Sequence, residues 1–259
     1  MKSTILLWQK QMKKAIVYPE EIVGMLIQPI LWVILFGVGM RSMMSTSPGN
    51  SNEDYMTFVI PGIIALTAVG ATISGGSTWL NERLNGIVKE YLAAPIPRIS
   101  ILMGNATSSV SKVLIQVLVI LIVGLFMSAR LSDNPIGWLG GFLLIAGFGI
   151  GFSGFTLSVA SSTDSSEGYH MMIFLLQLPL LFLSNSHYPL ESLPTWMRIG
   201  AYLNPTTYVV TGFRQITLDS VPSMGPMANI PLWLCFTVTF GFAVLGMYLA
   251  LKAFKKSIK

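Results

Sequence analysis

Charged residues are scarce in this sequence, and cysteine and histidine are scarcer still. Asp, Glu, Lys and Arg make up 10% of the 259 residues, whereas an average soluble domain has about 25%. The single cysteine, Cys235, excludes an internal disulfide and is expected to be a small apolar packing residue. One cysteine and two histidines do not form a metal-ligand set, so we expect no metal site.

Several long runs contain no charged residue, and these runs predict membrane spans. A helix needs about 20 apolar residues to cross a hydrocarbon core, and backbone groups in lipid must pair within the segment. The alternating pattern of a membrane β-barrel is absent. We therefore expect an all-α membrane protein with six transmembrane helices, the fifth of which is short and either borrows from its flanks or turns back partway. The expected spans are about 22–41, 58–80, 105–129, 136–160, 170–185 and 230–252.

Basic residues are distributed unevenly over the expected loops, and this distribution predicts the orientation. With six spans, twelve of the sixteen Lys and Arg residues fall on one face, in the arm 1–20, the segment 81–112 and the C-terminal tail. Because loops rich in Lys and Arg stay in the cytoplasm, we expect a plasma-membrane protein with both termini cytoplasmic. Basic residues are not interleaved with aromatic ones in a patch, so nucleic acid is not an expected partner.

Residues 1–20 are expected to form a helix outside the spans, ahead of a single six-span domain over 21–259. Ile5, Trp8 and Ile16 lie at helical spacing with lysines between them. A helix with one apolar face and a lysine-rich opposite face lies in the membrane interface. Membrane lipid is therefore an expected partner of this segment.

The region 186–229, between the fifth and sixth spans, is too apolar for a free loop and too rich in proline for a span. Two short, partly re-entrant helices would fit it, because irregular backbone inside a membrane must be shielded by protein. The alternative is an amphipathic cap on the outer surface.

The segment 81–98 is charged and amphipathic, although it lies between two apolar runs. An apolar stripe at the spacing i, i+3, i+4, i+7 and i+8 predicts one face of a helix, and Pro95 and Pro97 end it. Such a helix either lies flat on its own bilayer or docks into a groove of a cytoplasmic partner. The apolar stripe comprises Leu84, Ile87, Val88, Tyr91 and Leu92, and the charged residues beside it are Glu82, Arg83, Lys89 and Glu90.

Two motifs resemble those of the ABC type-2 transporter permeases, the membrane subunits of drug, lipid and polysaccharide exporters. The first is Glu82-Arg83-x-x-Gly86-x-x-Lys89-Glu90-x-Leu92-x-Ala94-Pro95-x-x-Arg98, followed by Gly104. The second is Leu193-Pro194-x-Trp196, then Leu203-Asn204-Pro205-x-Thr207-Tyr208, and then Arg214. The chain departs from the family at Asn105, where many members have a lysine after the glycine, so no contact of that lysine is carried over.

The resemblance implies a permease subunit of an exporter rather than an enzyme. A second permease chain, in a homodimer or a heterodimer, would complete the path, and a separate ATP-binding subunit would bind ATP and Mg. The chain itself lacks the Gly-x-x-x-x-Gly-Lys-Ser/Thr motif that holds phosphates, so no cofactor is expected in it. The residues implied for docking on a coupling helix are Glu82, Arg83, Leu84, Ile87, Val88, Lys89, Glu90, Tyr91, Leu92 and Arg98. Those implied for an outer gate are Pro194, Trp196, Asn204, Pro205 and Tyr208.

Neutral polar residues within the expected spans indicate a path for amphipathic, lipid-like, drug or glycan cargo. These residues are Gln28, Thr67, Thr72, Gln116 and Gln177. The same residue types also form hydrogen bonds between membrane helices, so both roles stay open. Import and ion pumping stay open as well.

Two other functions compete with that of an exporter. The stretch Gly151-Phe152-Ser153-Gly154 matches the Gly-x-Ser-Gly of rhomboid-type intramembrane proteases, in which a histidine activates the serine. The candidate bases His170 and His187 lie near the two ends of the fifth expected span, and small residues are also common where membrane helices pack. A proton-coupled carrier is disfavoured because no charged residue lies in the middle of a span.

Overall fold

A computed structural model describes residues 2–39, 52–94, 96–127, 131–186, 194–218 and 230–257. Within these ranges the protein is helical and has no strand, as the sequence predicts. The helices are α1 Lys2–Val17, α2 Pro19–Gly39, α4 Asn52–Leu84, α5 Ile87–Ala93 and α6 Arg98–Phe126. They continue with α7 Pro135–Ser162, α8 Ser166–Phe182, α9 Thr195–Leu203, α10 Pro205–Thr217 and α11 Leu232–Ser257.

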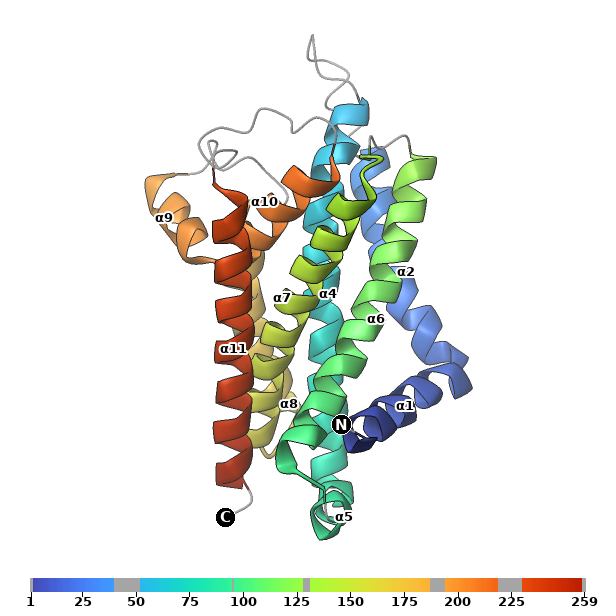
Figure 1. The fold of residues 1–259 in the computed structure, drawn as a ribbon, viewed down its shortest axis with the longest axis vertical. Helices are drawn as coiled ribbons and strands as arrows, with labels where there is room; N and C mark the ends of the chain where they lie inside the picture. The colour runs from blue at the N-terminus through green and yellow to red at the C-terminus, as the bar shows by residue number, and fades with distance from the viewer. Residues whose placement is uncertain are drawn as a thin grey trace.

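The long helices run side by side, and the short ones lie at the two ends of this bundle (Figure 1). Helix α7 packs against α4, α6, α10 and α11, and α1 packs across the lower part of α6. Helix α5 lies just beyond the last turn of α4, at the bottom of the view, and both chain ends lie in the lower half. We call this the α5 end of the molecule and the opposite one the α10 end.

Four of the described helices are long and apolar enough to cross a membrane. These are Thr57–Leu84, Arg98–Phe126, Pro135–Ser162 and Leu232–Lys256. The first expected span corresponds to α2, whose apolar part Val23–Leu35 is shorter. The fifth corresponds to α8, whose 17 residues reach about 26 Å, less than the ~30 Å of a hydrocarbon core. The short fifth helix matches the sequence analysis, and the count of six spans remains a prediction.

Glycines allow α7 and α11 to approach each other closely. A Cβ built on Gly154 would lie 2.2 Å from the carbonyl carbon of Gly246, and one on Gly246 would lie 2.1 Å from the oxygen of Gly151. Small residues let membrane helices bring their backbones into contact. The Gly-x-Ser-Gly stretch is therefore part of a helix crossing.

The predicted amphipathic helix over Leu84–Leu92 is wrong in one respect, because it is not continuous. Leu84 is the last residue of α4, and α5 begins at Ile87. Between them Gly86 adopts a left-handed conformation with φ 79°, which glycine reaches without steric cost. The chain therefore turns sharply at Gly86, and the apolar stripe is divided between two helices.

Two short helices, α9 and α10, do form between the fifth and sixth expected spans. Helix α10 is buried against α4, α7, α8 and α11, whereas α9 exposes Trp196 and Leu203. The rest of the protein therefore shields α10 but not α9, and their partial re-entry into the membrane remains a prediction. Most of the loop expected between the first two spans lies outside the described residues.

Candidate functional site

The last turn of α4 contacts α1 through a cluster of three polar side chains. Lys10 of α1 forms a salt bridge with Glu82, with Nζ 3.2 Å from Oε1, and also donates a hydrogen bond to the Tyr91 hydroxyl on α5. The Tyr91 hydroxyl in turn donates to Glu82 at 3.4 Å. Lys10 lies over the Tyr91 ring, 4.9 Å from its centroid, within the range of a cation–π contact. The predicted docking residues Glu82 and Tyr91 therefore bind the chain's own N-terminal helix.

These contacts shift the pKa values of Lys10 and Tyr91. Burial alone lowers the pKa of Lys10, but its hydrogen bond to Tyr91 and the charge of Glu82 offset this, so the pKa is raised overall. Burial and the charge of Glu82 raise the pKa of Tyr91, although Lys10 acts in the opposite direction. Lysine stays charged and tyrosine neutral near neutral pH, so the cluster is a pair of opposite charges bridged by a hydroxyl.

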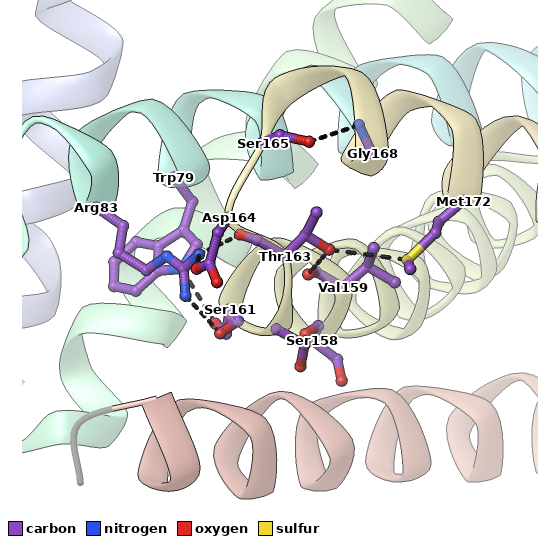
Figure 2. Close-up of polar contacts among 11 residues, drawn as sticks. Trp79, Arg83, Ser158, Val159, Ser161, Thr163, Asp164, Ser165, Gly168 and Met172 are labelled. Carbon is purple, nitrogen blue, oxygen red and sulfur yellow. Dashed lines mark hydrogen bonds and ion pairs between the residues drawn. The ribbon is translucent and has the colours of Figure 1, made fainter.

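Arg83, which follows Glu82 in the chain, contacts the C-terminal end of α7 and the turn before α8 (Figure 2). Its guanidinium donates to the carbonyl oxygen of Ser161 at 2.7 Å and to that of Thr163, and it pairs with Asp164 Oδ1 at 2.9 Å. The last carbonyls of a helix have no partner within the helix, and a cation is favoured there. Arg83 therefore caps α7. Trp79, one turn earlier, donates from Nε1 to Ser161 Oγ at 3.2 Å.

The apolar face of α5 packs against this chain's own core. Val88 is 4% exposed and lies in a cluster with Trp79, Leu80 and Ile101, against which Tyr91 and Leu92 also pack. We call α5 and the turns on either side of it, from Leu84 to Arg98, the α5 corner. Its exposed side chains are mostly charged or polar. The predicted docking residues on that exposed surface are Leu84, Lys89, Glu90 and Arg98, while Ile87 is half-buried.

Helix α1 is held on α6 by contacts that the sequence analysis did not identify. A Cβ on Gly104 would lie 2.7 Å from the Leu7 Cβ, so the glycine in the first motif lets the two helices touch. Trp8 Nε1 donates to Ser111 Oγ at 2.9 Å, and Ser108 Oγ donates to Gln11 at 3.1 Å. In the sequence, the feature that could have indicated this interface is Gly104, a small residue that follows the charge-rich first motif.

Asn105, the residue at which the first motif departs from the family pattern, is buried in this protein. Its Nδ2 donates to the carbonyl oxygen of Gly75 on α4 at 3.3 Å. A buried lysine at this position would need a partner for its charge, whereas the amide pairs with α4 directly. The side chain therefore joins α4 and α6.

The predicted outer-gate residues are divided between a buried turn and an exposed helix. Asn204, which is buried, accepts from the backbone N–H of Thr206 at 2.9 Å and so caps α10, which begins with Pro205. Its Nδ2 donates to the carbonyl oxygens of Leu180 and Leu183 at the end of α8. Because Asn204 also ends α9, it joins α8, α9 and α10. Tyr208 donates to the Tyr202 carbonyl oxygen at 2.8 Å, and Pro194 and Trp196 are exposed.

Arg214 of the second motif lies in the interior, 3% exposed. Its guanidinium donates to the carbonyl oxygen of Phe58 at 2.9 and 3.2 Å and to that of Asn185 at 2.9 Å. It also lies over the Phe58 ring, 4.0 Å from the centroid. One cation thus joins α10, the start of α4 and the segment after α8. In the sequence Arg214 was visible only as the last residue of the second motif, and its burial was not predicted.

The predicted path residues differ in their exposure and in their hydrogen-bond partners. The hydroxyls of Thr67 and Thr72 bond carbonyls of their own helix, and Gln116 Nε2 donates to the Met25 carbonyl oxygen at 2.7 Å and so holds α2 against α6. Gln28 on α2 is exposed and Gln177 on α8 is half-buried. Three of the five therefore have structural hydrogen bonds, and the path role remains a prediction.

The serine-protease alternative gains no support from the described residues. Ser153 is fully buried on α7 and its hydroxyl has no hydrogen-bond partner there. His170 is exposed and stacks edge-on against Tyr169, and His187 lies outside the described residues. The part of the chain that the structure describes also holds no cluster of three metal-ligating side chains.

Comparison with known proteins gives a family and several relatives. The model of the ABC-2 type transporter family matches residues 2–218. The transport permease ycf38 of Cyanophora paradoxa is 31% identical over 76% of this chain and 67% of its own. The daunorubicin resistance ABC transporter permease protein DrrB1 of Streptomyces coeruleorubidus is 22% identical over 77% of this chain and 69% of its own. A multidrug ABC transporter permease of Escherichia coli K12, YbhR, is 26% identical over 77% of this chain and 54% of its own.

Proposed function

Because the chain belongs to the ABC-2 type transporter family, we propose that it forms half of the membrane path of an exporter for amphipathic cargo. Proteins of this family are membrane permease subunits of ABC transporters, and a separate subunit hydrolyses ATP. This chain is a multi-pass membrane permease. The orientation proposed for it places the α5 end in the cytoplasm of the cell, where ATP is available.

The α5 corner is the proposed docking point for the ATP-binding subunit, which holds ATP and Mg. Its apolar face is anchored in the chain's own core through Val88, and its opposite face presents Lys89 and Glu90 to the surroundings, beside a 49% exposed Leu84. This division is the observation that carries the proposal. A helix that is anchored in its own protein and exposes a charged face can be displaced by a bound partner while it stays attached to the rest of the chain. A helix that lies on lipid would instead turn its apolar face outward.

A second copy of this chain is proposed to complete the path. Exposed apolar side chains cover the outer surfaces of α2, α8 and α11, among them Leu35, Phe174 and Val244, and lipid or another permease chain would cover them. The cargo is proposed to be uncharged or amphipathic, such as a drug, a lipid or a lipid-linked glycan. The prediction that no charged residue lies in the middle of a span is wrong for Lys112, which lies at the centre of α6. No Asp or Glu lies within the expected spans, and carboxylates inside a membrane usually mark ion or proton paths.

Copurification tests the docking proposal. A tagged chain isolated from native membranes should bring down a protein with an ATP-binding motif, and the pair should hydrolyse ATP while the isolated chain does not. Reversing both charges on the free face of α5, in Lys89→Glu with Glu90→Lys, should reduce capture of that subunit by about tenfold. A matched charge change at the same end of the molecule, Lys256→Glu on α11, should leave capture intact. Equal capture by all three proteins would disprove docking at α5.

A further inference from the structure

We propose that Arg83 is a positioning residue that couples α5 to α8. A displacement of the α5 corner would then move α8 and, through it, the turn before α10. This inference rests on the proposed docking at α5. Arg83 was predicted to lie at the rim of the docking surface, but its guanidinium is directed into the chain, toward α7 and the turn that follows it (Figure 2).

The first step is the turn between α4 and α5, which three backbone hydrogen bonds close. The backbone N–H of Asn85 donates to the Asn81 carbonyl oxygen at 3.0 Å, that of Gly86 to Arg83 at 3.1 Å, and that of Lys89 to Gly86 at 2.9 Å. A turn whose backbone groups are paired on both sides resists bending. A push on α5 therefore displaces the last turn of α4, including Arg83.

The second step is the contact of Arg83 with the α7–α8 turn. Its side chain is only 17% exposed, whereas Asp164, its ion-pair partner, is 94% exposed. An ion pair with one partner in water contributes little, so the bonds to the carbonyls of Ser161 and Thr163 must supply most of the connection. A planar guanidinium can serve several acceptors at fixed angles, which a lysine cannot do.

The third step leads from this turn into α8. Ser165 Oγ accepts from the backbone N–H of Gly168 at 3.0 Å and caps the helix, and Thr163 Oγ1 contacts Met172 Sδ at 3.7 Å. At the far end of α8, the carbonyls of Leu180 and Leu183 bind Asn204. One helix thus extends from the Arg83 contact to the cap of α10.

The test uses the complex with the ATP-binding subunit that copurifies from native membranes, held in lipid nanodiscs. A single cysteine replaces the exposed Thr195 at the start of α9, in a Cys235→Ala background, and its labelling by a maleimide is timed with and without ATP and vanadate. ATP should change the labelling rate of the parent protein. In Arg83→Lys that change should fall by about tenfold, although the subunit still binds and still hydrolyses ATP. Lys256→Gln, which loses an exposed charge at the same end, is the control.

One further variant separates the carbonyl bonds of Arg83 from its ion pair. Asp164→Asn keeps the carbonyl bonds, so its ATP response should fall by no more than about twofold. A full response in Arg83→Lys, or none in the parent, would overturn the coupling role. Failure to capture an ATP-hydrolysing subunit at all would instead reject the proposed function.

Discussion

Glu82 and Arg83 are adjacent in the chain, yet their side chains bind different neighbours. Glu82 accepts from Lys10 of α1 at 3.2 Å, whereas Arg83 donates to the end of α7 and to Asp164 of the next turn. The last turn of α4 therefore lies between the N-terminal helix and the α7–α8 turn. A movement of the α5 corner reaches two parts of the protein through two consecutive residues.

Between about pH 7 and about pH 9 the Lys10 contact should be independent of pH. Its pKa is raised above the ordinary value of 10.5, so its stabilising effect is complete below that value and is lost as the pH rises through the folded pKa. Lys10→Met should destabilise the protein by up to ~1 kcal/mol, because the lysine is half-exposed. The loss should be equal at about pH 7 and about pH 9 and shrink above about pH 10.5. Thermal unfolding of the purified protein in detergent measures it.

Lys13→Met is the matched control for this effect. Lys13 is an exposed lysine on the same helix, so its loss should not change the unfolding midpoint at any of these pH values. If both variants behaved alike, the Lys10–Glu82 contact would contribute nothing.

The helices were predictable because their signals are local. Runs without charge predicted the four long helices, and the proline-rich region predicted α9 and α10. The break at Gly86 was missed since the apolar spacing of Leu84 and Ile87 continues across it. Apolar periodicity describes a face of a helix and is insensitive to a single left-handed residue.

The contacts of the site were not predictable from such patterns. Lys10 and Glu82 are 72 positions apart, and Arg83 and Asp164 are 81 apart. No local pattern relates residues at that distance in sequence. An apolar stripe also looks the same whether it covers the chain's own core, as Val88 does, or a groove on another protein.

Gly154→Ala should destabilise the crossing of α7 and α11. The added Cβ would lie 2.2 Å from the Gly246 carbonyl carbon, and backbone atoms cannot move aside as a flexible side chain can. Overpacking of this kind costs about 1–3 kcal/mol. Gly70→Ala is the control, because nothing lies within 4 Å of its added Cβ and alanine favours a helix by about 1 kcal/mol. The unfolding midpoint should fall for the first variant alone; a fall in both would contradict the close approach.

Ser153→Ala should be tolerated or should stabilise the protein. The Ser153 hydroxyl is buried without a hydrogen-bond partner among the described residues, and such a group costs about 1–3 kcal/mol. A serine-directed fluorophosphonate should label neither the parent nor the variant. Labelling of the parent at Ser153 would restore the protease alternative.

Asn204→Ala should destabilise the α10 end more than Asn204→Ser does. Serine can still cap α10 by accepting from Thr206, and losing a cap costs about 1 kcal/mol. Neither variant can bind the carbonyls of Leu180 and Leu183 as the asparagine does. Unfolding midpoints should therefore decrease in the order parent, serine, alanine. A serine variant equal to the parent would show that the bonds to α8 do not contribute.

Arg214→Met should cause the largest loss of stability of these variants. The carbonyls of Phe58 and Asn185 would lose their donors in the interior, at about 1–3 kcal/mol each. Arg214→Lys keeps the charge but has a single nitrogen in place of the planar guanidinium. Its stability should lie between those of the parent and of Arg214→Met only if that nitrogen reaches one of the two carbonyls. Among the described residues no carboxylate pairs with Arg214, so the contact with the Phe58 ring and the hydrogen bonds to carbonyls must offset the cost of burying the charge. Thermal unfolding of the two variants measures these effects, and Lys256→Met, which removes an exposed charge on α11, is the control. If the lysine variant were less stable than the methionine variant, burying the charge would destabilise the protein by more than its hydrogen bonds stabilise it.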